Sequence, residues 1–293
     1  MFNTKKKTKK RKESVKETVA LSKPGAFELV ISMLSDVGCV RELNEDSGRY
    51  VQPADPDVLQ RKGVLIVVAD GMGGHTAGEV ASGLAVEVVS RAYYDDSGDP
   101  RSALETAFHK ANLAIHNEAE KDASKNGMGT TCTALVLQNG TAISAHVGDS
   151  RLYLIRDGSI YLMTEDHSAV MEMVKAGLIT LEQARHHPEK NVILRAMGSH
   201  PEVDVTTWQE PFPVRAGDRF LLCSDGLYDL VQDDEIKRIV SLSVPQTACE
   251  NLISLAKERG GHDNITVGIV NLKPQGGDES SDVPETRTAE TPK

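Results

Sequence analysis

The sequence predicts an α+β protein in which mainly antiparallel strands form layers and helices lie outside them. Two hairpin signals carry this prediction. Asn139-Gly140 and Asp157-Gly158 are residue pairs typical of type I′ turns, and each pair lies between two strand-like runs. Because the strands are grouped in hairpins and do not alternate singly with helices, a parallel doubly wound sheet is disfavoured.

Two segments show the strand patterns most clearly. In residues 27–36, Phe27, Leu29 and Ile31 alternate on one face, as expected for a half-buried strand. Residues 63–70 form a continuous apolar run rich in Val and Ile, which indicates a central strand buried on both sides. The remaining strands are predicted within 131–138, 141–147, 152–156, 159–163, 219–225 and 264–272.

Helices are predicted between these groups of strands. Asp99 and Pro100 are suited to the N-cap and the first position of a helix. Thr180 and Gln183 form the pattern of a capping box. The predicted helices cover residues 79–94, 99–121, 180–187 and 245–261, and the last of them ends on glycine.

Charge divides the chain of 293 residues into three parts. Residues 1–18 hold eight Lys or Arg and two Glu, whereas the chain from residue 274 onward holds five acids and two bases. The net charge of −10 therefore leaves about −13 for the body between them. We expect a basic disordered arm at residues 1–24, one folded domain at residues 25–273 and an acidic disordered tail at residues 274–293.

The same composition limits the partners and the location. The acidic body argues against wide contact of the folded domain with a nucleic-acid backbone. No run of 18 apolar residues and no signal-peptide core is present, so we expect no membrane span and a cytoplasmic location. We expect a monomer. The basic arm is either a solvated tail or a contact for an anionic membrane or an acidic partner.

Five aspartates lie beside the predicted strands. Asp70, Asp149, Asp225 and Asp263 each stand near a strand end and near a glycine, and Asp46 is expected in the turn after the first strand. One such aspartate is commonly a turn former or an N-cap. Several of them at one edge of the sheets would repel one another unless cations neutralise the carboxylates.

The residue types indicate which cation. Carboxylates with waters and an occasional carbonyl suit Mg²⁺ or Mn²⁺. The four cysteines form no C-x-x-C and H-E-x-x-H is absent, which argues against a zinc site. Two metals on aspartates can activate water for an in-line phosphoryl displacement.

Gly73 and Gly78 are spaced like the two glycines of a phosphate-binding P-loop. A P-loop requires Lys and then Ser or Thr after the second glycine, but Glu79 and Val80 follow here. A carboxylate at that position would repel phosphates, so nucleotide binding is disfavoured. The glycines instead allow a tight turn from a buried strand into a helix.

Seven segments resemble, in order and spacing, the motifs of the metal-dependent Ser/Thr protein phosphatases of the PPM (type 2C) family, bacterial branch. They are RELNED, ADGMGGHTAGEVAS, GMGTTCTALVL, SAHVGDSRLYLI, TEDHS, LLCSDGLYDLV and GGHDNITVGIV. The resemblance covers roughly residues 27–272. It implies a four-layer αββα sandwich with a dinuclear Mn²⁺ or Mg²⁺ centre at one end of the sheets. Residues 25–273 would then be the catalytic domain, with a flap at about residues 167–200.

The resemblance also implies roles for the core of this centre. Asp70 resembles the carboxylate that bridges both metals, and the carbonyl of Gly71 a ligand of the second. Asp225 and Asp263 resemble the remaining ligands of the first metal.

Three further residues receive roles by the same resemblance. Asp46 resembles an acid close to the metals that could bind one through water, and Asp149 is expected to hold a third, weaker metal together with Asp225. Arg41 matches the family's phosphate-binding arginine, whose planar guanidinium can hold two phosphate oxygens.

His75 departs from the pattern of some family members. These members place a histidine two residues after the bridging aspartate as a general acid, whereas that position is Met72 here and His75 comes five residues after Asp70. His75 is therefore either this acid or a turn histidine, and a metal-bound water is the alternative proton donor. The histidines in or beside the flap are expected at the solvated surface: His186, His187 and His200.

The activity that the resemblance implies is hydrolysis of phosphoserine and phosphothreonine on proteins. A hydroxide between the two metals would attack phosphorus without a covalent enzyme intermediate. The implied partners are phosphorylated proteins and a cognate Ser/Thr kinase. The alternative is a catalytically silent PPM-like binding module, which would be expected to lack one or more metal aspartates, whereas Asp70, Asp225 and Asp263 all stand in their motifs.

Overall fold

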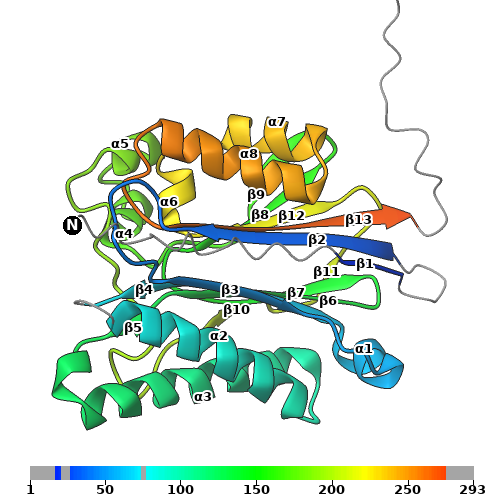
Figure 1. The fold of residues 1–293 in the computed structure, drawn as a ribbon, viewed down its shortest axis with the longest axis horizontal. Coiled ribbons are helices and arrows are strands. Elements are labelled where there is room, and N and C mark those ends of the chain that lie inside the picture. Colours follow the sequence, from blue (N-terminus) through cyan, green and yellow to red (C-terminus); the bar gives the residue numbers. More distant parts are fainter. Residues whose placement is uncertain (1–16, 21–26, 74–76, 275–293) are drawn as a thin grey trace, which may run out of the picture.

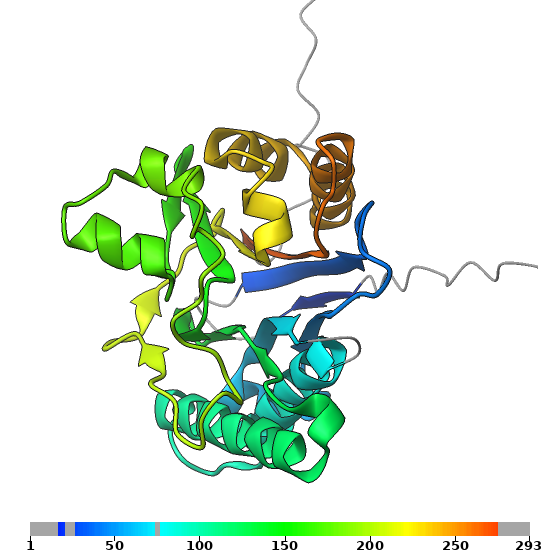
Figure 2. The same ribbon diagram turned by 90° about the vertical axis from the view of Figure 1, so that its left-hand side faces the viewer.

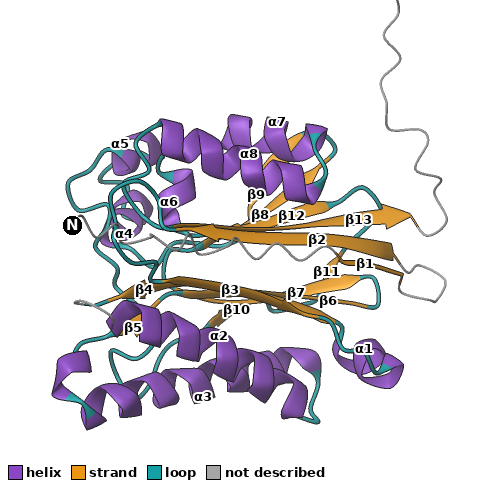
Figure 3. Cartoon of the chain, viewed as in Figure 1, coloured by secondary structure: helices purple, strands orange, loops and turns teal. Residues whose placement is uncertain are grey.

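Two antiparallel β-sheets lie face to face, and helices cover the outer face of each (Figures 1 and 3). The structure is a computed structural model that describes residues 17–20, 27–73 and 77–274. The four layers are the predicted αββα arrangement, so the predicted fold class is confirmed.

The first sheet has six strands in the order β1-β2-β13-β12-β8-β9, all paired antiparallel. Helices α7 and α8 cover its outer face (Figure 1). The elements of this half are β1 (Glu17–Ala20), β2 (Phe27–Asp36), β8 (Arg151–Arg156), β9 (Ser159–Leu162), β12 (Arg219–Cys223), β13 (Ile265–Pro274), α7 (Asp233–Leu242) and α8 (Pro245–Glu258).

Strand β1 was not predicted, because it lies in the basic arm, for which composition indicates disorder. It pairs antiparallel with β2, with Glu17 opposite Ile31 and Ala20 opposite Glu28. The expectation of disorder is therefore wrong for these four residues. Backbone hydrogen bonds to a sheet edge do not require an apolar sequence, and composition alone cannot reveal them.

The second sheet has seven strands, of which five follow the order β10-β7-β6-β4-β3, while β11 pairs with β7 and β5 with β4. Helices α2 and α3 cover it (Figure 1). The elements are β3 (Asp46–Val51), β4 (Val64–Met72), β5 (Gly129–Thr130), β6 (Cys132–Gln138), β7 (Thr141–Val147), β10 (Thr206–Thr207), β11 (Phe212–Pro213), α1 (Pro56–Lys62), α2 (Ala77–Asp95), α3 (Pro100–Lys121) and the 3₁₀ turn η1 (Ala123–Lys125).

Three short helices lie at one end of the sandwich. Helices α4 (Ala169–Lys175) and α5 (Leu181–Arg185) belong to the predicted flap, and α6 (Asp225–Tyr228) directly follows β12. Figure 2 faces this end and shows the flap on one side of the two sheets. Among the described residues, no helix has the length and apolar character that crossing a membrane requires.

The local signals of the sequence explain the connections. Asn139 and Asp157 have φ angles of 48° and 51°, and the glycine after each is also left-handed, as type I′ turns require. Asp99 caps α3 by accepting hydrogen bonds from two backbone N–H groups, and Thr180 with Gln183 forms the predicted capping box of α5.

Apolar residues form three layers of core, one between the sheets and one beneath each pair of helices. Strand β4 is buried along most of its length, as predicted for a central strand. In α2 the fully buried stripe includes Ala81, Ala85 and Val89, whereas Val80 and Leu84 are only partly buried. Small alanines on this face let α2 pack closely between β4 and α3.

Candidate metal centre

The five aspartates singled out by sequence lie at or next to the ends of strands. Strand β3 begins here, β4, β7 and β12 end here, and β13 begins two residues after Asp263. Asp46 and Asp149 are buried, whereas Asp70 and Asp225 are partly accessible to solvent. The charges of the other four aspartates all act on Asp70, so these carboxylates lie near one another.

Asp46 is directly opposite Asp70. It is the first residue of β3 and pairs with Asp70 in the β3–β4 register. The expectation that Asp46 lies in a turn is wrong, because the chain enters the new strand at this residue. Its Oδ2 accepts a hydrogen bond from Ser224 Oγ at 2.7 Å, whereas its buried Oδ1 has no hydrogen-bond partner within the described ranges.

Two threonines hold the backbone of Asp70. Asp70 N donates to Thr131 Oγ1 at 2.9 Å, and Asp70 O accepts from Thr131 N at 2.9 Å and from Thr130 Oγ1 at 2.8 Å. Thr131 Oγ1 also lies 2.7 Å from Ser150 Oγ, next to Asp149. These hydroxyl groups connect the positions of the two aspartates.

Gly71 and Gly78 are required by close packing. A Cβ atom at Gly71 would lie 2.1 Å from Gly78 O and 2.6 Å from Glu45 O, and Gly71 N donates to Glu45 O at 3.1 Å. Strand β4, the start of α2 and the segment before β3 therefore meet at van der Waals contact. Gly78, the second glycine of the spacing that resembles a P-loop, is part of this contact. His75 lies outside the described residues, and its role stays a prediction.

Asp225 follows β12 of the first sheet, and Asp149 lies in the turn between β7 and β8. Asp225 is the first residue of α6 and comes two residues after the end of β12. The backbone of Asp149 is held by Tyr228, one turn further along α6, whose Oη donates to Asp149 O at 3.0 Å.

Arg41 and Asp263 form an ion pair, with Arg41 Nη2 at 2.9 Å from Asp263 Oδ2. The guanidinium is half exposed, and its hydrogen bond to Asp263 raises the pKa of Arg41. The arginine predicted to bind phosphate thus lies beside a predicted metal ligand, at the rim of the site.

Loss of solvation and mutual repulsion raise the pKa of these carboxyl groups. Burial, followed by the charges of the neighbouring aspartates, raises the pKa of Asp70 and of Asp225 well above the usual range. Burial raises the pKa of Asp46 to about 6 and that of Asp149 to about 7. Without a counter-cation, protons must therefore neutralise part of the cluster near neutral pH.

The donor set is suited to hard cations, because it consists of oxygen atoms. Within the described ranges, no three His, Cys, Asp or Glu side chains are placed so that together they could hold a metal ion. Asp263 is instead paired with Arg41.

Asn264 is a structural residue of the site that sequence reasoning missed. Its Nδ2 donates to the carbonyls of Val37 at 3.0 Å and Leu43 at 2.9 Å, and its Oδ1 accepts from Glu45 N at 2.8 Å. These bonds fix the segment that carries Arg41. The only sequence signal was its place after Asp263 in the H-D-N motif.

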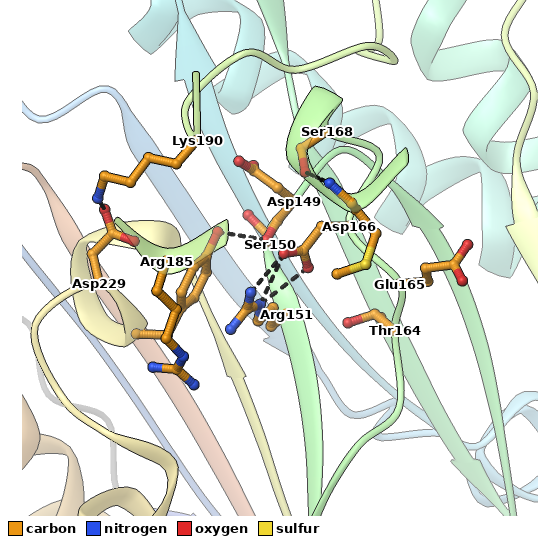
Figure 4. A network of polar contacts seen from close by, with 12 residues as sticks. Asp149, Ser150, Arg151, Thr164, Glu165, Asp166, Ser168, Arg185, Lys190 and Asp229 are labelled. Carbon is orange, nitrogen blue, oxygen red and sulfur yellow. Dashed lines mark hydrogen bonds and ion pairs between the residues drawn. The ribbon is translucent and has the colours of Figure 1, made fainter. Parts of the chain in front are cut away.

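Ion pairs attach the flap to this end, and Figure 4 shows the one between Lys190 and Asp229. Lys190 contacts Asp229, and Arg185 contacts Asp233 at 3.1 Å. The flap and its flanks contain the three histidines expected at the surface. His186 and His200 are exposed as predicted, whereas His187 is half-buried and accepts from the backbone N–H of Glu189.

Comparison with known proteins agrees with this geometry. The family model described as protein phosphatase 2C matches residues 46–257. The serine/threonine phosphatase stp of Listeria innocua is 38% identical over 254 residues, which are 84% of this chain and 98% of that protein. The serine/threonine protein phosphatase PstP of Mycobacterium tuberculosis is 40% identical over 243 residues, which are 81% of this chain and 44% of PstP.

Solved structures show the same fold. The crystal structure of the Mycobacterium tuberculosis phosphatase PstP/Ppp matches with a TM-score of 0.75 and 39% identity, over 84% of this chain and 99% of that chain. The PstP catalytic domain in complex with two manganese ions matches with a TM-score of 0.73 and 38% identity, over the same shares of the two chains. The chain therefore belongs to the protein phosphatase 2C family of metal-dependent phosphatases.

Proposed function

We propose that this protein hydrolyses phosphoserine and phosphothreonine on other proteins and that Mn²⁺ or Mg²⁺ is required. The observation that carries the proposal is the group of aspartates at one end of the sheets, where Asp70 and Asp225 have pKa values well above the usual range. Such a group is costly without cations and binds them when it is deprotonated.

The residues present fit divalent cations. Asp46 has a buried carboxylate oxygen without a hydrogen-bond partner in the described chain, and every candidate ligand offers oxygen, which Mn²⁺ and Mg²⁺ prefer. Bound cations would activate water and neutralise charge on the phosphoryl group.

We assign the ligands by motif and position. Asp70, the carbonyl of Gly71, Asp225 and Asp263 would hold two ions, as many as the manganese complex of PstP contains. Asp149 together with Asp225 would hold a third, and Asp46 would bind one of the ions through water.

Arg41 would bind the phosphate of the substrate. Its guanidinium is half exposed at the rim and donates to Asp263, so this donor becomes available to phosphate oxygens when Asp263 turns to a cation. Arg41→Lys retains the charge but loses the planar pair of donors, so KM for a phosphopeptide should rise while the fold is unchanged.

Two donors are proposed for the proton that the leaving seryl or threonyl oxygen takes: His75 and a water of the metal centre. The variant His75→Gln separates them. Loss of the alkaline limb of the pH–kcat profile would support His75, and an unchanged profile would support water.

The relatives also support a wider role for the protein. The substrates would be phosphoproteins produced by a cognate Ser/Thr kinase, and residues 25–273 would be the catalytic domain of a cytoplasmic, monomeric enzyme. The alternative, a silent binding module, is disfavoured because all the assigned aspartates are present at the site. A calorimetric Mn²⁺ titration distinguishes them, since a silent module should bind Mn²⁺ weakly or not at all.

The variant Asp225→Asn tests the proposed function. Removing one carboxylate should abolish phosphate release from a phosphothreonine peptide while the circular dichroism spectrum stays that of the wild type. Wild-type turnover by this variant would overturn the assignment of Asp225 and the metal-dependent mechanism built on it.

A further inference from the structure

The TEDHS motif contains a histidine, His167, that the proposed chemistry does not use. His167 is buried at the base of the flap, directly before the N-cap of α4. Its ring lies 4.8 Å from the ring of His146, which is also buried. A polar side chain enclosed at this depth requires partners, and those partners show what it holds.

His167 binds Gly148 through two hydrogen bonds. His167 N donates to Gly148 O at 2.7 Å, and Gly148 N donates to His167 Nδ1 at 3.1 Å. Gly148 has a φ of +106°, and a Cβ there would lie 2.6 Å from the side chain of Thr131. The residue directly before Asp149 is thus fixed in a left-handed conformation between the flap base and the threonine that holds Asp70.

The hydrogen bonds define the state of the imidazole. A backbone N–H can only donate, so Nδ1 of His167 is the unprotonated nitrogen, and Nε2 donates to Thr206 Oγ1 at 3.0 Å. Burial lowers the pKa of His167 to about 4, in agreement with a neutral ring. One tautomer therefore bridges β10 and the turn that carries Asp149.

His167 and the nearby Ala169 join the two ends of the flap. Leu194 N donates to His167 O at 2.7 Å, and Ala169 N donates to Val192 O at 2.9 Å. Next to His167, Asp166 makes a bidentate contact with Arg151, which follows Asp149 by two residues (Figure 4). The base of the flap thus contacts both sides of Asp149.

We propose that His167 is a positioning residue that couples the base of the flap to the carboxylate of Asp149. The acceptor at Nδ1 keeps the Gly148 turn in the conformation that directs Asp149 toward Asp225, whereas the bond to Thr206 fixes only the ring. The inference rests on the proposed function, since it assumes that Asp149 helps to hold the third and weakest cation.

Calorimetric Mn²⁺ titration of the full chain tests the coupling with four variants. Asp149→Asn is the reference for loss of the weakest binding event. His167→Leu removes the acceptor and should weaken that event about 10- to 100-fold, as loss of groups that orient metal ligands does. His167→Asn places an amide oxygen near the position of Nδ1 and should restore binding to within about threefold of the wild type. Thr206→Val removes only the bond at Nε2 and should leave the event unchanged.

The outcomes are distinguishable. If His167→Leu leaves the weakest event unchanged while Asp149→Asn abolishes it, the coupling is wrong. If His167→Asn fails to restore binding although its thermal midpoint equals that of the wild type, the role assigned to Nδ1 is wrong. If Asp149→Asn itself changes nothing, the assignment of Asp149 falls and the coupling with it, whereas phosphate release by the wild type and its loss in Asp225→Asn would still support the proposed function.

Discussion

Asp149→Asn should make the cation-free protein less sensitive to alkaline pH. Asp149 is only 4% exposed, and burial, with the Asp166 charge as the next cause, raises its pKa from 3.8 to about 7. The folded state therefore binds this proton more tightly than the unfolded chain. This contribution to stability is complete below the unfolded pKa and is lost as the pH rises through about 7.

The size of the effect follows from the two pKa values. At roughly 1.4 kcal/mol per pH unit, their difference corresponds to about 4 kcal/mol over the whole range and to about 3 kcal/mol between pH 5 and pH 8. Asparagine cannot ionise, so the variant should not lose this amount. Removing the Asp149 charge also relieves Asp225, whose pKa it raises, and that effect has the same sign.

Urea unfolding in the presence of a chelator, followed by circular dichroism, measures the difference. Between pH 5 and pH 8 the wild type should lose about 3 kcal/mol more unfolding free energy than the variant. In saturating Mn²⁺ at pH 8 the wild type should instead have the higher unfolding free energy of the two proteins, because it offers one more carboxylate to a cation. Parallel pH dependences in chelator would refute the account of Asp149 as a buried, proton-binding carboxyl.

Two further pairs of variants test the packing and the ion pair. Gly71→Ala would place Cβ 2.1 Å from a carbonyl oxygen of α2 and should lower the stability measured by thermal denaturation by about 1–3 kcal/mol. Gly83→Ala, with no described atom within 4 Å of the added carbon, should stabilise the helix by up to about 1 kcal/mol. Equal effects of the two substitutions would contradict the packing argument. Asp166→Asn breaks a buried ion pair with Arg151 and should lower the unfolding free energy by about 3–5 kcal/mol. Asp157→Asn, in an exposed ion pair, should change the unfolding free energy by less than about 0.5 kcal/mol. A small loss for Asp166→Asn would show that its ion pair with Arg151 does not stabilise the fold.

Local patterns predicted most of the fold, because the signals act over a few residues. The left-handed φ of Asn139 and Asp157 is set by the turn itself, and the cap at Asp99 by the next two N–H groups. Because Asp70 and Asp225 both lie at the ends of predicted strands, the sequence predicted that they lie near one another. That prediction did not require the order of the strands, since strand ends at one edge of the sheets lie close together in any order.

Tertiary partners account for what the sequence did not reveal. Asp46 faces Asp70 only because β3 pairs with β4 in that register, and Arg41 meets Asp263 from 222 positions away. Thr131 was part of a quoted motif, but its bonds to Asp70 depend on β5 and β6 lying beside β4. Contacts of this kind can be predicted only once the fold is known.

Phosphate release from a phosphothreonine peptide by chelator-stripped protein, with Mn²⁺, Mg²⁺ or Ca²⁺ added back singly, tests most directly whether catalysis depends on cations held by the aspartates. The account predicts no release in chelator and recovery of release with Mn²⁺ or Mg²⁺. Release that continues at an undiminished rate without any added cation would contradict it.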